Sequence, residues 1–255
     1  MGNVAAAMAS ASPPQAPVTD SSGRLPLLFV IADTGGGHRA AAAAVTDALE
    51  ERYPGRFQPV LCNPLDGPDS SRLLRWVTGL YGPSIRIAPW TWGVIYYSSD
   101  SKMAMAFLRR SLLALANRPL RAAVAEQQPA AIVSFHPLVG AAAAKARRAS
   151  LGGEPPLIAV ITDLVTPHTA WRYDKVDEWV VPSAAVRWAC HLDRIPLDRC
   201  HEVGLPVGAA FPNGPARPLM GSMDRSRPHA RPEIRIAAPY ERRRRPALTP
   251  GCNDR

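Results

Sequence analysis

The sequence of 255 residues lacks any apolar run that approaches the roughly 20 residues of a membrane-spanning helix. It has only four cysteines: Cys62, Cys190, Cys200 and Cys252. Because none of them forms a Cys-x-x-Cys pair, we expect free thiols in a reducing compartment. The two Cys-His dipeptides do not have the spacing of common zinc sites, so we expect no bound metal.

The first 24 residues lack hydrophobic periodicity and an apolar core of the kind that signal peptides carry. Arg24 is the first basic residue, so an arginine-rich transit peptide is not evident either. Ala, Ser and Pro dominate this stretch, and such a composition cannot bury a core. We therefore expect residues 1–24 to be a disordered leader.

The net charge of +9 is concentrated near the C-terminus. Residues 209–255 contain ten arginines and four acidic residues, which leaves about +3 for the rest of the chain. The high pI is therefore weak evidence for nucleic acid, and we expect no nucleic-acid partner.

Residues 209–255 also lack an apolar period. They are either a basic disordered tail or a frame-shifted segment, since GC-rich DNA read out of frame yields mostly Arg, Pro, Ala and Gly. We favour the frame shift.

Between residues 25 and 208, short apolar runs alternate with helix-forming segments. We predict strands at 27–32, 57–62, 131–135, 157–162, 178–181 and 201–203. We predict helices at 40–53, 102–127, 138–149 and 184–191. This alternation predicts an α/β fold, a Rossmann-like doubly wound parallel sheet.

Residues 66–100 interrupt that rhythm with many aromatic and basic side chains. Trp76, Trp90 and Trp92 lie here together with Arg86. Aromatic residues mixed with arginines on helix-forming sequence suit the surface of an anionic bilayer. The alternative, an inserted helix that packs on the core, stays open, and both can hold for different faces.

The most informative segment follows the first predicted strand. It consists of Asp33, Thr34, Gly35, Gly36, Gly37, His38, Arg39 and Ala40. Glycines permit a tight turn and a close approach to a ligand, and the helix start behind them offers unpaired N–H groups. The segment is not a P-loop, because no Gly-Lys-Ser/Thr follows. It matches the dinucleotide fingerprint, but Cys62-Asn63 replaces the expected acid, so dinucleotide binding is a lesser alternative.

Further polar residues follow the next strands of the predicted sheet. His136 comes directly after the third strand and precedes Pro137, while Asp163 and His168 follow the fourth. Because parallel strands end at the same edge of a sheet, we expect these side chains to meet His38 in one cleft.

Four motifs, in this order, resemble the N-terminal domain of the monogalactosyldiacylglycerol synthase family. They are residues 33–40, 134–138, 162–164 with His168 and Trp171, and 204–207. That family includes bacterial diacylglycerol glycosyltransferases and is similar to the peptidoglycan glycosyltransferase that makes lipid II. The resemblance covers residues 25–208.

The resemblance implies a GT-B glycosyltransferase, with an acceptor and membrane domain at 25–208 and a membrane-facing insert at 66–100. A second domain would bind UDP-galactose or UDP-glucose. The sugar would pass with inversion to the 3-hydroxyl of diacylglycerol, without a metal or another cofactor. His38 is implied as the general base, and a helix N-terminus suits this role because it disfavours the imidazolium.

The resemblance also implies the residues that hold the lipid acceptor. They are Gly35, Gly36, Gly37, Arg39, His136, Pro137, Asp163, His168 and Trp171. Asp163 could orient the acceptor, or it could be a turn or helix-capping residue. Contact with the membrane or with acyl chains would fall to Trp171 and to the insert, through Trp76, Trp90, Trp92 and Arg86.

The sequence departs from the family pattern at two points. Asn63 stands where the family carries an acidic residue. In the family, the motif at 204–207 leads into a donor domain. The sequence of residues 209–255 lacks the strand, glycine-rich loop and helix pattern expected of such a domain. We expect a glycolipid-forming hexosyltransferase without its donor half, inactive alone; the alternative is a non-catalytic module that binds anionic lipid. We expect it peripherally on the cytoplasmic face of a bacterial membrane, with the chloroplast envelope as the alternative.

Overall fold

A computed structural model of the chain describes residues 19–208, apart from 33–35, 68, 69, 89, 172 and 174. These residues belong to one compact unit, Met1–Pro212. The leader up to residue 18, Gly35 and the tail at 209–255 lie outside the described residues. Residues 19–24, assigned above to the leader, form a turn. In this turn Asp20 Oδ1 accepts hydrogen bonds from the backbone N–H groups of Ser22 and Arg24, both at 2.8 Å.

Six strands form one sheet, and all neighbouring strands run parallel. They are β1 (Leu25–Val30), β2 (Phe57–Cys62), β3 (Ala131–Ser134), β4 (Leu157–Val160), β5 (Glu178–Val181) and β6 (Cys200–Glu202). Their order across the sheet is β2-β1-β3-β4-β5-β6. The predicted Rossmann-like parallel sheet is confirmed.

Helices flank both faces of the sheet. The α-helices are α2 (Gly36–Arg52), α3 (Arg72–Gly79), α4 (Tyr81–Ile87), α5 (Trp90–Ser99), α6 (Lys102–Arg110), α7 (Asn117–Gln127), α8 (Pro137–Ala146) and α9 (Ala184–Leu192). Short 3₁₀ turns are η1 (Leu112–Ala116), η2 (Arg147–Ala149), η3 (Thr169–Trp171) and η4 (Leu197–Arg199).

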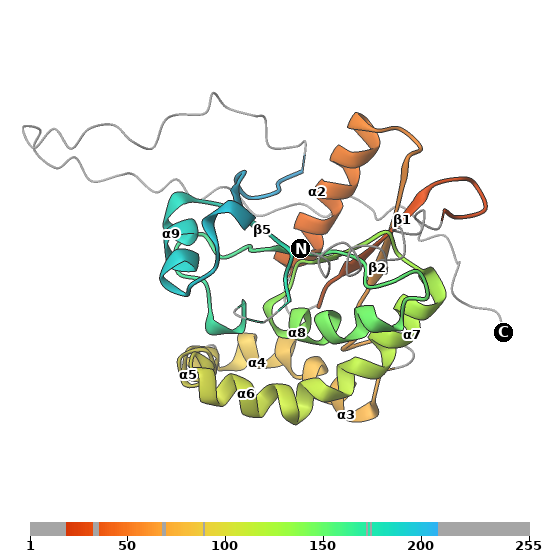
Figure 1. Cartoon of the computed structure of the whole chain (residues 1–255). Coiled ribbons are helices and arrows are strands. Elements are labelled where there is room, and N and C mark those ends of the chain that lie inside the picture. The colour runs from red at the N-terminus through yellow and green to blue at the C-terminus, as the bar shows by residue number, and fades with distance from the viewer. Residues whose placement is uncertain are drawn as a thin grey trace, which may run out of the picture. The chain divides into compact units, whose positions relative to one another are not determined.

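The side chains of β1 alternate between two apolar cores, which places the helices in layers. Leu28 and Val30 join the larger core, to which α7 and α8 contribute. Leu27 and Phe29 join the smaller core, which α2 covers. Figure 1 shows α2 on one side of the sheet and α7 and α8 on the other. A strand buried on both faces explains why the 25–32 run is apolar throughout.

The single helix predicted at 102–127 is wrong, because the chain breaks in its middle. At Ser111 the backbone leaves the helical region, with φ −97° and ψ −100°. Residues 112–116 form η1 before α7 begins at Asn117. Pro119 explains the restart: it lacks an N–H and would break a continuous helix, but it is tolerated in the first turn of a new one.

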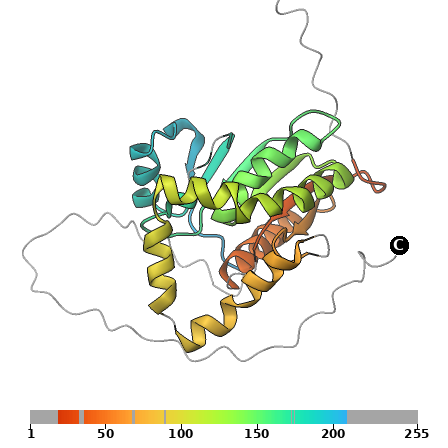
Figure 2. The ribbon, with the colours of Figure 1, turned by 90° about the horizontal axis from the view of Figure 1, so that it is seen from below.

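The predicted insert at 66–100 folds into α3, α4 and α5, and α6 continues it. Figure 2 shows these helices, in orange and yellow, projecting beyond the sheet. Leu74 of α3 and Met105 of α6, each 1% exposed, attach this arm to the larger core. Among the described residues, no helix combines the length and the apolar character needed to cross a bilayer.

Candidate functional site

His38 and His136 lie at the point in the sheet where the connections that follow two neighbouring strands, β1 and β3, leave toward opposite faces. His38 is the third residue of α2, which follows β1, and His136 caps the N-terminus of α8, which follows β3. Strands β1 and β3 are neighbours, and their helices leave toward opposite faces of the sheet. Doubly wound sheets bind their ligands in the crevice at such a switch point.

The two imidazoles contact each other directly. Their ring centroids are 4.4 Å apart, with the planes at 64°. Nδ1 of His38 lies 3.2 Å from the hydroxyl oxygen of Thr162, and the ring also hydrogen-bonds the backbone of Phe135. Because a carbonyl only accepts, a neutral imidazole uses its single N–H for this bond. The neutral ring thus has one N–H and one lone-pair nitrogen, and which of the two faces the Thr162 hydroxyl depends on the tautomer.

Burial keeps both rings neutral near pH 7. It lowers the pKa of His38 from its usual 6.5, against the opposing effects of the Phe135 backbone and the Asp163 charge. Burial, and then the charge of His38, lower the pKa of His136 to about 3. Nδ1 of His136 accepts the backbone N–H of Leu138 at 3.2 Å. His136 is therefore a neutral cap of α8 that also forms a wall beside His38.

Asp163 organises the loop that follows β4. Its Oδ2 accepts the backbone N–H of His168 at 3.1 Å and the indole N–H of Trp171 at 2.9 Å. These contacts support the interpretation of Asp163 as a turn residue. The Asp163 carboxylate also lines the cavity beside His38, and its negative charge raises the pKa of the His38 ring. A role of Asp163 in binding a ligand stays a prediction.

His168 connects this loop to the insert. Its Nδ1 accepts the backbone N–H of Ala170 at 2.9 Å, so the ring carries a proton on Nε2. Nε2 lies 3.2 Å from both the carbonyl oxygen of Tyr96 and the hydroxyl of Ser99, at the end of α5. The insert is thus tied to the loop that borders His38.

Two cavities meet at His38 and Asp163. The first, of about 360 Å³, also has His136, Pro137 and His168 in its lining, with the further contributions Ile95, Tyr96, Ser99, Leu138 and Ala170. His38 follows β1, His136 follows β3, and Asp163 and His168 follow β4, and all four line this one cavity. This is the arrangement expected of residues at the carboxyl ends of parallel strands. The second cavity, of about 390 Å³, reaches the other predicted motifs, with Gly37, Thr162, Leu205, Pro206 and Val207 in its lining.

Not every predicted residue lies at these cavities. Gly36 and Arg39 are exposed on the first turn of α2, and neither lines either cavity. Trp171 is only 1% exposed and packs in the larger core. The expectation that it contacts the acceptor or the membrane is therefore corrected, because the bond to Asp163 and the core hold its ring inside.

Sequence reasoning missed several lining residues. Thr162 had a detectable signal, since it is a hydroxyl residue at the end of a strand and precedes Asp163. Ile95, Tyr96 and Ser99 had none, because nothing local shows that α5 folds back onto the 163–171 loop.

The insert exposes many large apolar side chains. Trp76 is 64% exposed and Trp90 71%, and Arg86 is also exposed. The side chain of Trp92 lies outside what the structure describes. Further exposed apolar residues on α3 to α6 and the turns between them are Leu73, Leu80, Ile87, Val94, Ile95, Tyr96, Tyr97, Met103 and Phe107. We call these residues, with Trp76 and Trp90, the apolar face.

The chain matches the family model described as monogalactosyldiacylglycerol (MGDG) synthase over residues 38–207. It is 26% identical over 195 residues to monogalactosyldiacylglycerol synthase 3, chloroplastic, of Arabidopsis thaliana, covering 73% of this chain and 40% of the relative. It is 27% identical over 186 residues to a probable monogalactosyldiacylglycerol synthase 2, chloroplastic, of Oryza sativa subsp. indica, covering 72% and 39%.

Among solved structures, the chain is similar to the apo form of the lipopolysaccharide outer core galactosyltransferase WaaB. The TM-score is 0.45 at 12% identity, covering 71% of this chain and 45% of that one. The match to the curated plant relatives spans about 40% of their length.

Proposed function

This chain belongs to the monogalactosyldiacylglycerol synthase family, and from that premise we propose that it serves glycolipid synthesis. In this proposal, residues 25–208 are the acceptor half of a GT-B hexosyltransferase. The acceptor is diacylglycerol, and UDP-galactose or UDP-glucose is the sugar donor, held by a donor domain.

The observation that carries the proposal is the position of His38 at the junction of two cavities. The first cavity is walled by Ile95, Tyr96 and Leu138, which suits the glycerol backbone and the first carbons of acyl chains. Diacylglycerol has one free hydroxyl, and a neutral imidazole beside it can accept the hydroxyl proton. The second cavity opens toward residues 205–208 and is the side from which a donor sugar can approach.

The proposed reaction is a single displacement. His38 takes the proton of the 3-hydroxyl as its oxygen forms a bond to the anomeric carbon. The bond from that carbon to the diphosphate breaks, and UDP leaves from the opposite face, so the configuration inverts. The buried, neutral state of the His38 ring supports the role of base, because the lone pair is available at neutral pH.

The apolar face supports peripheral attachment to a membrane. Helix α5 contributes Trp90 and Tyr97 to the exposed surface and Ile95 and Tyr96 to the cavity wall. A lipid could therefore pass from the bilayer to His38 along one helix. Arg86 is placed to contact anionic headgroups, which add about 1 kcal/mol for each basic residue near the surface.

Binding of a short-chain diacylglycerol tests the acceptor site without a donor. We expect dioctanoylglycerol to bind the 255-residue chain saturably in isothermal titration calorimetry. Ile95→Asp places a charge in the cavity wall and should weaken binding at least tenfold. Leu151→Asp, at an 87% exposed turn position, is the control and should leave it unchanged. Equal binding by both variants would refute the site.

A chimera tests the chemistry. It joins residues 19–208 to the part of the Arabidopsis relative that follows its matched region, and galactolipid formation from UDP-galactose is measured. His38→Ala should lower the turnover of this chimera by about a hundredfold or more, with dioctanoylglycerol affinity retained. Retained turnover would show that His38 is not the base.

A further inference from the structure

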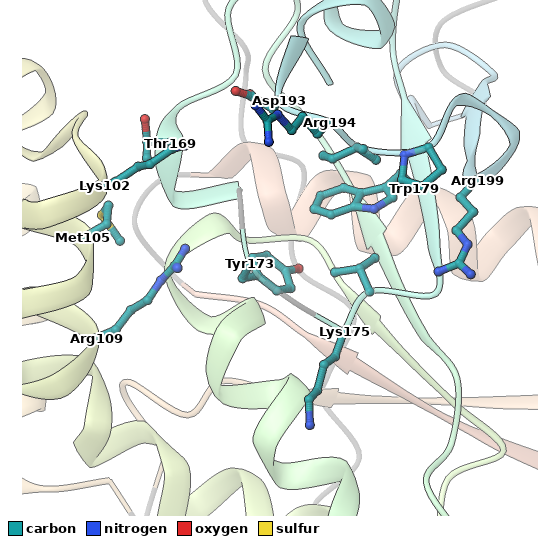
Figure 3. A pocket seen from close by; sticks show the side chains of 13 residues that line it. Lys102, Met105, Arg109, Thr169, Tyr173, Lys175, Trp179, Asp193, Arg194 and Arg199 are labelled. Atoms are coloured by element: carbon teal, nitrogen blue, oxygen red, sulfur yellow. The ribbon is translucent and has the colours of Figure 1, made fainter. Parts of the chain in front are cut away.

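A third cavity, with a strongly basic lining, lies apart from His38. It has a volume of about 470 Å³ and is bordered by α6, by the segment between η3 and β5, and by the segment between α9 and β6. Figure 3 shows side chains from these three regions facing one another around it. It shares no lining residue with the two cavities beside His38.

The floor and the rim of this cavity differ in character. The floor is apolar and buried, with Met105, Tyr173, Val176 and Trp179 each 8% exposed or less. Its positively charged lining residues are Lys102, Arg109, Lys175, Arg194 and Arg199. The sole acidic residue among the described lining residues is Asp193.

Four of these cations are exposed to solvent. Within the described part of the chain, no ion pair involves Lys102, Lys175, Arg194 or Arg199. Arg109 extends from α6 toward Tyr173, as Figure 3 shows. Several positive charges around a concave surface raise the local concentration of anions.

The backbone supplies a second, independent observation. The described residues include three non-glycine residues with positive φ, and two of them, Lys175 at +69° and Arg194 at +64°, line this cavity. Side chains other than Asn, Asp and Gly rarely adopt this conformation, since it costs conformational energy. At Arg194 the positive φ belongs to the C-terminal cap of α9, in which the Ile195 N–H donates to the Cys190 carbonyl at 3.0 Å and the Arg194 N–H to the His191 carbonyl at 2.9 Å. Lys175 is not at a helix end, and such outliers gather at ligand sites, where a side chain must be presented at a fixed place.

The basic lining continues beyond this cavity. A neighbouring cavity of about 320 Å³ shares Arg109, Tyr173 and Lys175 and adds Lys145 and Arg148, of which Arg148 pairs with Glu154 at 3.3 Å. In Figure 3 the Lys175 side chain points away from Trp179. Among their described lining residues, the two cavities together have more positive than negative side chains, and we call them the basic groove.

We propose that the basic groove binds a phosphate ester, with its phosphate between the rim cations and its organic part over Tyr173 and Trp179. Arginine and lysine are the side chains that hold phosphate, through charge-assisted hydrogen bonds. A phosphate monoester carries nearly two negative charges at pH 7, which matches several convergent cations better than a singly charged carboxylate does. This ligand site requires neither His38 nor sugar transfer.

The phosphate ester can come from a membrane lipid or from solution. Helix α6 bears on the question because it borders both surfaces. Lys102, Met105 and Arg109 line the groove, while Met103 and Phe107, 86% and 74% exposed, belong to the apolar face. The two sources share their phosphate chemistry and are separated by the choice of probe.

The experiment is isothermal titration calorimetry with the 255-residue chain at physiological ionic strength. Glycerol 3-phosphate is the soluble probe, and phosphatidylcholine vesicles with and without phosphatidic acid are the lipid probe. We expect saturable binding of at least one phosphate probe. Binding of glycerol 3-phosphate identifies a soluble ligand, and binding confined to phosphatidic acid vesicles identifies a headgroup. Absence of saturable binding for both overturns the proposal.

Matched variants locate the binding. Arg194→Asn combined with Arg199→Gln removes two groove charges, and Asn tolerates the positive φ at 194. We expect this pair to weaken binding at least tenfold. Arg118→Gln with Arg121→Gln makes the same change in charge at exposed positions of α7 and should keep the affinity within twofold. An equal loss in both pairs would show only general attraction and overturns the proposal.

Two further variants complete the test. One asks whether Lys175 binds phosphate or only stabilises the fold, and the other asks whether the basic groove is independent of the acceptor site. Lys175→Gly relieves the left-handed backbone, so we expect an unchanged or higher melting temperature with weaker phosphate binding. Unaltered binding would contradict the proposal. His38→Ala should leave phosphate binding intact, so the acceptor site and the basic groove can fail independently.

Discussion

The imidazole of His38 lies 4.4 Å, centroid to centroid, from that of His136, and burial lowers the pKa of both. The positive charge of either protonated ring would be desolvated and would lie close to the other ring. Both rings are therefore neutral near pH 7. His136 meanwhile holds the start of α8 through its bond to the Leu138 N–H.

Acid should destabilise the fold through these histidines. The pKa of His136 is about 3 in the folded chain, against about 6.5 when unfolded. Above pH 6.5 the ring is neutral in both states. As the pH falls from 6.5 toward 3, only the unfolded chain gains the proton, so the unfolding free energy falls by up to about 1.4 kcal/mol per pH unit. Urea unfolding at several pH values measures this slope.

His136→Asn should flatten that slope while keeping a capping oxygen for α8. His191→Asn, at an exposed position of α9, is the control and should leave the slope unchanged. An unchanged slope in His136→Asn would mean that this ring is not neutral in the folded chain.

Thr162 is expected to be a positioning residue, because its hydroxyl lies 3.2 Å from Nδ1 of His38. Thr162→Val keeps the shape and removes the hydroxyl. In the chimera we expect kcat to fall about fivefold, equivalent to about 1 kcal/mol, with dioctanoylglycerol affinity unchanged. Thr162→Ser restores the hydroxyl and should restore kcat. If Val and Ser behave alike, the hydroxyl does not orient the ring.

Asp163 should stabilise the fold through Trp171. The carboxylate accepts the indole N–H at 2.9 Å, and hydrogen bonds to a charged group contribute about 1.5–3 kcal/mol. Asp163→Ala should therefore lower the unfolding free energy by about 2–3 kcal/mol. A double-mutant cycle with Trp171→Phe should give a coupling of at least about 0.5 kcal/mol. Trp188→Phe, on exposed α9, should be additive with Asp163→Ala.

The apolar face should decide membrane attachment. Trp76→Ala and Trp90→Ala should each weaken binding to anionic vesicles about tenfold, because burying a large apolar side chain contributes about 1.5 kcal/mol or more. Vesicle sedimentation measures the partition. Trp188→Ala is a matched control, since Trp188 is 60% exposed on α9 and lies outside the apolar face. If all three variants lose binding equally, the apolar face is not the contact.

The sequence by itself determined the parallel sheet and the place of the candidate site. Short apolar runs and the triple glycine are local signals, and parallel strands end at one edge whatever the packing. That rule alone brought His38, His136, Asp163 and His168 to one cavity. The family resemblance, carried by four motifs in order, agrees with the match over residues 38–207.

Tertiary structure decided what depends on contacts between distant segments. The return of α5 onto the 163–171 loop brought Tyr96 and Ser99 to His168. Trp171 packs in the larger core and donates its indole N–H to Asp163. The basic groove joins residues of α6, the approach to β5 and the turn after α9, none of which forms a motif alone. Periodicity reports which residues are buried, whereas the partners of a polar side chain are set only when the elements pack.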